Sequence, residues 1–372
     1  MRPIRFTPFS SSSLGSTGAS NRRDCRPLRS MLIVFGLVLL LCTGAGAGVA
    51  VAAPVAPLPI AASVDLTGSF SSIWASAADD IWITSTYSGN VFHFDGYRWA
   101  EVATGFNGSL SALWGSGSTN LYAVGRDYDT YQAAVLHFDG KAWHKTTFDV
   151  GLVFSGVWGS GPDDVYVVGT QCGACAPSAA DIANPVGRVL VLHFDGRTWS
   201  QIESSEAGGL QSVHGRGPDD IYAVGHSVYG TGAMRGLIMH FDGRTWRRVD
   251  RADDARIYKA VWTTATGVYA AADGAIVRFD GTRWTTTQID AYINALWGSG
   301  DEILAVGSAV YHSDGKSWLP LSTNLTTDTL RGIWAFEDAS YYAVGADGVF
   351  QVLGATVEHH YSHLPLVARP TR

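Results

Sequence analysis

The chain has 372 residues, of which 46% are hydrophobic and only 16% are charged, and it contains 13 Trp, 15 Tyr and 43 Gly. A composition so rich in aromatic and apolar residues excludes a disordered chain. The formal net charge is −7. Apart from the arginines of Arg2–Arg29 no basic stripe is present, which argues against a nucleic-acid-binding protein.

The N-terminal segment has the pattern of an export signal. An uncharged run, MLIVFGLVLLLC, occupies Met31–Cys42, arginines precede it, and small residues ending in GVAVAAP follow it. Together these form a secretory signal peptide. We expect residues 1–53 to be removed, leaving no membrane span and a protein that is secreted or lies at the cell surface or in the periplasm. A retained anchor ranks second, because Gly and Ala dominate after the apolar run. A lipoprotein through Cys42 ranks third, because Leu41 stands where a small residue is expected.

The two cysteines outside this signal form the motif CGAC at Cys172–Cys175. In an oxidising compartment this spacing favours a disulfide between Cys172 and Cys175 within one loop. A zinc site would need two further soft ligands, so we expect no metal, and no motif indicates a cofactor.

A tryptophan-centred phrase such as SGVWGSGPDDVYVVG, at Ser155–Gly169, occurs seven times. Its anchor positions lie about 35–56 residues apart, a period typical of propellers and solenoids. The anchors are Trp74, Trp114, Trp158, His214, Trp262, Trp297 and Trp334.

Each copy contains four short runs of β-branched and aromatic residues separated by Gly, Pro or Asp, as in FSGVWGS, DVYVVG, RVLVLHF and RTWSQI. No segment with a helical period follows Pro54. The prediction is an all-β, seven-bladed β-propeller of four-stranded antiparallel blades over residues 70–361, with a β-solenoid as the second choice. Residues 362–372 form an unassigned tail.

A second phrase, VLHFDGRTW at Val191–Trp199, recurs in six copies, and its Asp-Gly pair predicts a tight hairpin turn. Its final Trp starts the outermost strand, where we expect it to wedge between blades. Its histidines lie on different blades, too far apart to share a metal, so we expect them to make structural hydrogen bonds. They are His93, His137, His193, His240 and His312, with Arg278 and Gln351 in the other two copies.

The seventh copy lacks the second phrase and has VFQVLG at Val349–Gly354 instead. Blade 7 is therefore the expected closure point of the ring. Two alternatives stay open: a strand from SVDLTG at Ser63–Gly68, within an N-terminal segment 54–69, clasps the ring, or ATVEHHYS completes the blade unaided.

These phrases resemble the secreted bacterial β-propeller repeat proteins written WGSGPDDVYAVG…HFDG..W, and the resemblance covers essentially all of Phe70–Leu353. The outer turn is also similar to the Asp-box of sialidase-type propellers: Asp195, Gly196, Thr198 and Trp199 match in order, with one residue missing between Asp and Gly. Asp-boxes are structural turns in that family too. WD-repeat and kelch propellers match less well. The likeness implies a fold and not an activity.

One column of the first phrase varies in chemistry while staying polar, three residues before each anchor. Because the first strand of a propeller blade lines the central channel, we expect these side chains to converge at its mouth; plain solvated lining is the alternative. The column comprises Ser71, Ser111, Ser155, Gln211, Lys259, Asn294 and Arg331.

Three hairpins between the second and third strands are long and dissimilar, at Arg126–Gln132, Thr170–Gly187 and His226–Gly236. They belong to adjacent blades and open on the face that holds the channel mouth. Long loops on a rigid scaffold often carry binding, although neutral drift in loop length is the alternative. The candidate ligand-binding residues are Arg126, Tyr128, Tyr131, Tyr229, Arg235, Lys259, Asn294 and Arg331.

The favoured function is an exported recognition module that binds a glycan or an extracellular protein on this loop-rich face. The second hypothesis is a sialidase-like glycosidase, in which Arg126, Arg235 and Arg331 hold a carboxylate, Tyr258 attacks, and Asp127 or Asp129 serves as the acid. The third is a structural component of the cell envelope. No catalytic motif appears, so no catalytic residue is assigned, and the oligomeric state stays open.

Overall fold

The structure is a computed structural model that describes residues 60–63, 66, 68–172, 187–229, 232–249, 256–322, 329–336, 340–346 and 348–353. All of them belong to one compact unit, Val55–Arg372. The expected signal segment 1–53, Cys175 and the tail 362–372 lie outside the described residues. Within the described ranges the regular structure consists of strands, and no helix is long and apolar enough to span a membrane.

Seven four-stranded antiparallel sheets form the blades. Blade 1 comprises β2 (Phe70–Ala77), β3 (Asp80–Ser85), β4 (Val91–Phe94) and β5 (Trp99–Val102). Blade 2 comprises β6 (Gly108–Gly117), β7 (Asn120–Asp127), β8 (Ala133–Phe138) and β9 (Trp143–Thr147). Blade 3 comprises β10 (Leu152–Gly161), β11 (Asp164–Cys172), β12 (Gly187–Phe194) and β13 (Trp199–Ile202). Blade 4 comprises β14 (Gly208–Gly217), β15 (Asp220–Tyr229), β16 (Ala233–Phe241) and β17 (Trp246–Arg248).

The remaining blades follow the same order along the chain. Blade 5 comprises β18 (Tyr258–Thr264), β19 (Gly267–Ala272), β20 (Ala275–Phe279) and β21 (Trp284–Gln288). Blade 6 comprises β22 (Ile293–Ser299), β23 (Glu302–Gly307), β24 (Val310–Ser313) and β25 (Trp318–Ser322). Blade 7 comprises β26 (Leu330–Ala335), β27 (Ser340–Gly345), β28 (Val349–Leu353) and, from the other end of the chain, β1 (Ile60–Ser63).

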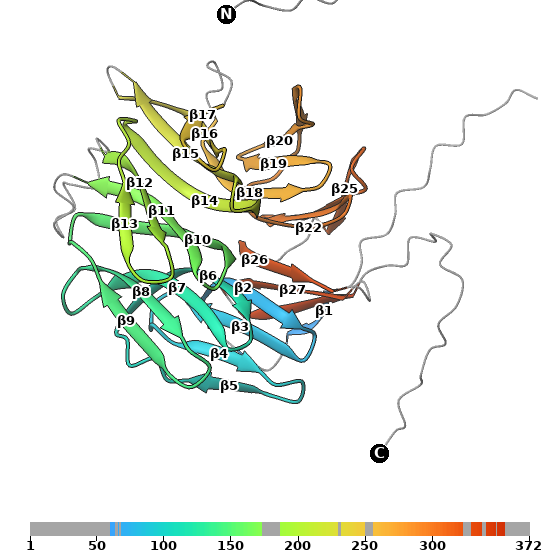
Figure 1. The fold of residues 1–372 in the computed structure, drawn as a ribbon. Helices are drawn as coiled ribbons and strands as arrows, with labels where there is room; N and C mark the ends of the chain where they lie inside the picture. The colour runs from blue at the N-terminus through green and yellow to red at the C-terminus, as the bar shows by residue number, and fades with distance from the viewer. Residues whose placement is uncertain are drawn as a thin grey trace, which may run out of the picture. The chain divides into compact units, whose positions relative to one another are not determined.

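The first strand of each blade contacts the first strands of both neighbours, and β26 of blade 7 contacts β2 of blade 1. Figure 1 shows this closure, with the blue β2 beside the red β26. The seven sheets therefore form a ring around a central channel, which confirms the predicted seven-bladed propeller.

Blade 7 is completed by the N-terminal part of the propeller chain. β1 pairs antiparallel with β28, so Ile60 lies opposite Val352 and Ser63 lies opposite Phe350. The pairing strand thus lies slightly earlier in the chain than the Ser63–Gly68 segment considered from sequence. Pairing the two ends of the chain in one sheet removes an exposed strand edge from β28.

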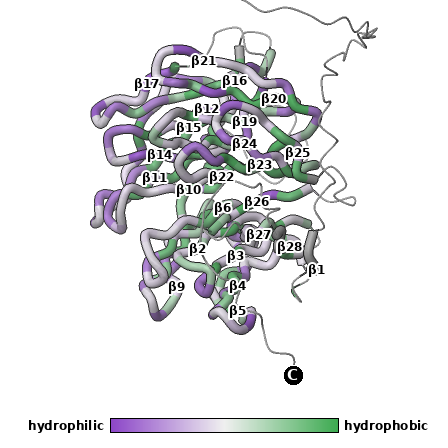
Figure 2. Tube along the Cα trace, turned by 90° about the vertical axis from the view of Figure 1, so that its right-hand side faces the viewer, coloured by the Kyte–Doolittle hydropathy of each residue, from purple (hydrophilic) through white to green (hydrophobic). Residues whose placement is uncertain are grey.

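Apolar burial is greatest in the second and third strands of each blade, and it explains the β-branched runs of the sequence. All six residues of β19 are buried, whereas β5 and β13 keep exposed residues on their outer side. Figure 2 shows hydrophobic residues along the strands and hydrophilic residues at many of the turns. The buried clusters lie between neighbouring blades, so each blade is stabilised by its neighbours.

The outer tryptophans contribute to these inter-blade clusters as predicted. Trp199 of blade 3 lies edge-on to Tyr122 of blade 2, with ring centroids 6.3 Å apart. Trp246 meets Tyr166 in the same way at 6.2 Å. The repeated Trp is therefore part of the scaffold.

Four of the five histidines of the column make the predicted structural hydrogen bond, whereas Nε2 of His137 is buried without a hydrogen-bond partner among the described residues. The His193 ring stacks on Tyr166 at 4.4 Å, and its Nε2 atom lies 2.6 Å from Asp164 Oδ1. His240 repeats both contacts with Tyr222 and Asp220. Each such histidine links the first turn of its blade to the third strand.

The Asp-Gly loops between the third and fourth strands of blades 1 to 6 are also structural. In blade 3 the carboxylate Oδ1 of Asp195 accepts hydrogen bonds from the backbone N–H groups of Arg197 and Thr198. These hydrogen bonds lower the pKa of Asp195. Gly196 supplies the positive φ, 84°, that the loop requires. Four residues, rather than the predicted two-residue turn, separate the paired Phe194 and Trp199.

Candidate binding site at the channel mouth

Every innermost strand carries a β-bulge at the variable polar position. In β14, Leu210 pairs with Gly225 and Ser212 pairs with Val224, which leaves Gln211 as the extra residue. The same shift occurs in β2, β6, β10, β18, β22 and β26. The seven bulged residues, called the mouth residues below, are Ser71, Ser111, Ser155, Gln211, Lys259, Asn294 and Arg331.

A bulge re-aims a side chain that regular pairing would direct at a neighbouring blade. It also accounts for the glycine that ends the repeated AVG motif. A Cβ built on Gly125 would lie 1.8 Å from the carbonyl oxygen of Ser109, and one on Gly169 would lie 1.8 Å from that of Val153. The close approach of the bulged strand therefore requires glycine at these positions.

The anchor positions form an aromatic collar deeper in the channel. The ring centroids of Trp74 and Trp334 lie 6.0 Å apart, and those of Trp297 and Trp334 lie 6.5 Å apart. The His214 ring stacks on Trp262 with a centroid distance of 3.9 Å. Glycine follows four of the seven anchors, at Gly115, Gly159, Gly215 and Gly298, and makes room there for the anchor ring of the preceding blade. A Cβ on Gly159 would lie 2.6 Å from Trp114, for example. The WGSG phrase is therefore a packing requirement of the collar.

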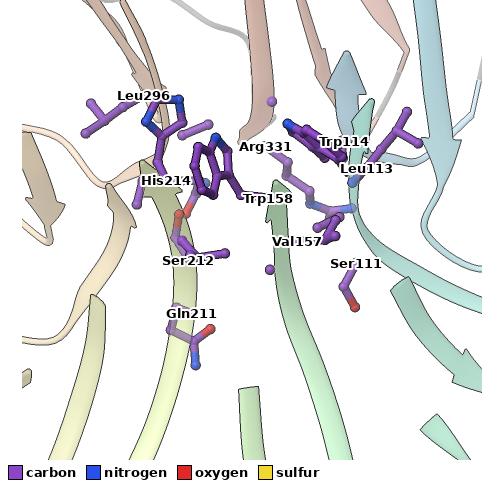
Figure 3. A pocket seen from close by; sticks show the side chains of 18 of the residues that line it. Ser111, Leu113, Trp114, Val157, Trp158, Gln211, Ser212, His214, Leu296 and Arg331 are labelled. Atoms are coloured by element: carbon purple, nitrogen blue, oxygen red, sulfur yellow. Dashed lines mark hydrogen bonds between the residues drawn. The ribbon is translucent and has the colours of Figure 1, made fainter. Parts of the chain in front are cut away.

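Two regions of empty space that share lining residues follow from this arrangement. The channel itself has a volume of about 240 Å³ and is lined by the first strands of all seven blades. A second pocket of about 520 Å³ is lined by Gln211, His226, Met234, Ile257, Lys259, Asn294 and Arg331. Figure 3 shows Gln211 and Ser111 toward one end of the channel and Trp114, Trp158 and His214 toward the other. The second pocket is called the mouth pocket below.

Three of the four mouth residues that line the mouth pocket make polar contacts that fix their positions. The Nη1 atom of Arg331 donates to Ser69 Oγ at 2.9 Å and to Thr86 Oγ1 at 3.0 Å, both in or beside blade 1. Asn294 Nδ2 donates to the Leu330 carbonyl at 2.9 Å. Lys259 Nζ lies 2.9 Å from Asp273 Oδ1. These contacts tie neighbouring elements together at the mouth.

The side chain of Gln211, in contrast, makes no hydrogen bond with any described residue. It shares the mouth pocket with His226, whose pKa is lowered by burial, so His226 is neutral near pH 7. Among the described residues that line this pocket there is no carboxylate. The mouth pocket is therefore rich in hydrogen-bond donors and holds two cationic side chains.

Exposed apolar side chains gather on the same side of the ring. In an antiparallel blade, the hairpin between the second and third strands and the connection to the next blade lie at one end, called the loop face. Seven of the nine large apolar side chains that are exposed among the described residues belong to this face. They are Tyr87, Tyr128, Tyr131, Val150, Val153, Met234 and Tyr292.

The structure brings together only part of the predicted site. Lys259, Asn294 and Arg331 share the mouth pocket. Arg126, Tyr128 and Tyr131 lie apart from it at the β7–β8 hairpin, where the Arg126 guanidinium is 5.6 Å from the Tyr131 ring centroid. Tyr131 adopts a positive φ of 58° in this hairpin.

The blade-4 hairpin contributes differently from the prediction. Arg235 is exposed and pairs in register with Ser227, while the side chain of Tyr229 lies outside the described residues. Met234 and His226 of this hairpin, and Ile257 before β18, line the mouth pocket instead. The repeat pattern missed these three because they lie in segments that do not repeat.

The residues of the glycosidase hypothesis do not assemble. Tyr258 is almost fully buried in the core between blades 4 and 5. Asp127 is fully buried, ion-paired with Lys145 Nζ at 2.7 Å, and accepts hydrogen bonds from the N–H groups of Asp129 and Thr130. Both residues are therefore structural, and neither lines a pocket with Arg331.

Two further expectations concern metal and cysteine. Within the described ranges, no group of three or more His, Cys, Asp or Glu side chains is arranged to hold a metal ion. Cys172 ends β11 and takes part in a disulfide. Its expected partner, Cys175, lies outside the described residues, so the pairing stays a prediction.

The fold and the pocket at one mouth define the chain as a β-propeller with a candidate ligand site on its loop face. No protein-family model and no curated protein matches the sequence. Solved structures do match. A catalytically inactive virginiamycin B lyase from Staphylococcus aureus with quinupristin has a TM-score of 0.62 at 10% identity, covering 79% of this chain and 98% of the lyase.

Two other matches have different functions. YCF48 bound to D1 peptide has a TM-score of 0.57 at 13% identity, covering 82% of this chain and 100% of YCF48. The extracellular domain of the one-component system BT4673 from B. thetaiotaomicron has a TM-score of 0.55 at 14% identity, covering 79% of this chain and 40% of that chain. At these identities the likeness establishes the fold alone.

Proposed function

We propose that this protein is an exported recognition module that binds a glycan or protein ligand on its loop face, over the channel mouth. One observation carries the proposal: seven of the nine exposed large apolar side chains among the described residues belong to that face. A concentration of exposed apolar side chains on one face favours an interaction surface there. The mouth pocket, lined by donors, adds polar groups that would fix the ligand's orientation.

The comparisons support this proposal without specifying the ligand. One similar structure holds a peptide and another is an extracellular domain. Export itself rests on the charged and apolar segments of residues 1–53.

The test compares the two faces of the ring. The purified protein is screened on a glycan array and used to capture proteins from a cell-surface extract. The double variant Tyr128→Ala/Met234→Ala changes the loop face, and Tyr97→Ala removes a side chain that is 94% exposed on the opposite face. We expect the loop-face variant to lose binding about 10- to 100-fold and the control to retain it.

Equal binding by the two variants would move the interaction to another surface. Failure of the wild-type protein to bind any glycan or protein would favour a structural role in the cell envelope.

A further inference from the structure

The charge of Arg331 is not neutralised within the described part of the protein. Its guanidinium donates from Nη1 to two neutral hydroxyls, those of Ser69 and Thr86, and forms no ion pair with a described residue. The other cation of the mouth pocket, Lys259, is paired with Asp273. Among its described lining residues, the mouth pocket therefore contains one positive charge without an ion-pair partner, held in place by the ring closure.

The chemistry around this charge suits an anion. Gln211 and Asn294 are amides that can donate, and the described part of the lining contains no carboxylate that would repel a negative group. Guanidinium binds carboxylate through parallel N–H···O hydrogen bonds. Because Nη1 is engaged, Nε and Nη2 are the atoms that can face an incoming ligand. A single net positive charge matches a monoanion better than a dianion.

The surface around the pocket suits a protein better than a sugar. The exposed apolar residues of the loop face include the aliphatic side chains of Val150, Val153 and Met234 as well as tyrosines. Sugars stack on flat aromatic rings, whereas methionine, tyrosine and arginine side chains are enriched in protein interfaces. A partner protein would cover these side chains while one of its carboxylates enters the mouth pocket.

We propose that the ligand is a partner protein that places one carboxylate, from its chain end or from an Asp or Glu side chain, against Arg331 in the mouth pocket. This inference rests on the proposed loop-face function and specifies its ligand. Gln211 and Asn294 would orient the carboxylate. Arg331 therefore has two roles, because the same guanidinium closes the ring through Nη1 and binds the ligand through its other nitrogens.

The experiment uses short probes of defined chemistry. Binding is followed through the chemical shifts of the tryptophan indole N–H groups, since tryptophans line the channel. The probes are N-acetyl-trialanine with a free carboxylate, the same peptide as its C-terminal amide, N-acetyl-Ala-Asp-Ala amide, and methyl glucuronide. We expect binding of the two carboxylate peptides and at least tenfold weaker binding of the amide. The tighter of the two identifies the source of the carboxylate.

Three variants separate binding from folding. Arg331→Gln removes the charge, and we expect it to weaken carboxylate binding about 10- to 100-fold. Because it also alters the ring closure, Gln211→Glu provides a second variant, which adds a repelling carboxylate at a side chain outside that contact. Arg197→Gln is the matched control, since Arg197 is exposed in an Asp-Gly loop on the opposite face.

Equal binding of the acid and the amide, or unchanged binding in Gln211→Glu, would overturn the inference. Binding of methyl glucuronide alone would replace the protein partner with an acidic glycan. If no carboxylate probe binds but the loop-face variant Tyr128→Ala/Met234→Ala still loses a captured ligand, the recognition function stands and the carboxylate inference fails.

Discussion

The Nδ1 atom of His214 accepts a hydrogen bond from the backbone N–H of Thr263, 3.2 Å away in the neighbouring blade. This bond fixes the neutral imidazole with its proton on Nε2. His214 is the one anchor that is not tryptophan, and its ring stacks on Trp262 at 3.9 Å. A small polar ring thus replaces an indole in the collar while keeping an inter-blade hydrogen bond.

The half-buried His214 should make stability depend on pH. Burial lowers its pKa from 6.5 to about 3. Below pH 6.5 His214 binds a proton in the unfolded chain but stays neutral in the folded protein. The free energy of unfolding that this residue contributes is therefore fully present above pH 6.5 and is lost as the pH falls. Between pH 7.5 and pH 5 the protonation of His214 should lower the free energy of unfolding by about 2 kcal/mol. Urea unfolding of wild type and His214→Phe at both pH values measures it, and an equal pH dependence in the two proteins would refute it.

The bulged register predicts a sharp contrast between two glycines of blade 2. Gly125→Ala places a Cβ 1.8 Å from the Ser109 carbonyl, whereas Gly117→Ala meets nothing within 4 Å. We expect Gly125→Ala to lower the free energy of unfolding by about 2–3 kcal/mol through overpacking. Gly117→Ala should stay within about 0.5 kcal/mol of wild type. Similar unfolding curves for the two variants would argue against the bulge.

Substitution of an outer tryptophan should lower the stability of the fold without changing which ligand is bound. Trp199 packs against Tyr122, Phe148 and Phe194 at the boundary of blades 2 and 3. Trp199→Ala should cost about 3 kcal/mol of unfolding free energy. Tyr97→Ala, at an exposed loop tip, should cost almost nothing. Thermal melts compare them, and a near-neutral Trp199→Ala would mean that the blade boundary repacks.

The closure strand constrains where export processing can cut. β1 begins at Ile60, so cleavage near residue 53 leaves the strand that pairs with β28 intact. N-terminal sequencing of exported protein should find a start between residues 50 and 59. A variant that begins after Ser63 should lose stability, because β28 then presents an unpaired edge. A native exported form that begins beyond Ser63 would contradict this role for β1.

The sequence alone determined the blade count, the four-stranded blades and the position of the variable column. These features follow from local chemistry repeated seven times: β-branched runs, turn residues and an aromatic at each anchor. The sequence also located Lys259, Asn294 and Arg331, because a polar column between regular apolar and small columns is visible without any structure.

Only the tertiary structure decided how those residues work. The alternation of side chains along a strand does not reveal an inserted residue. The seven bulges that direct the mouth residues could therefore not be predicted from the sequence. Ring closure brings Arg331 to Ser69, which precedes it by 262 positions, and no local pattern encodes such a contact. His226, Met234 and Ile257 join the pocket because the ring places their non-repeating segments beside it. Asp127, predicted near a ligand, is buried instead, because the hairpin needs its carboxylate to bind two backbone N–H groups and Lys145.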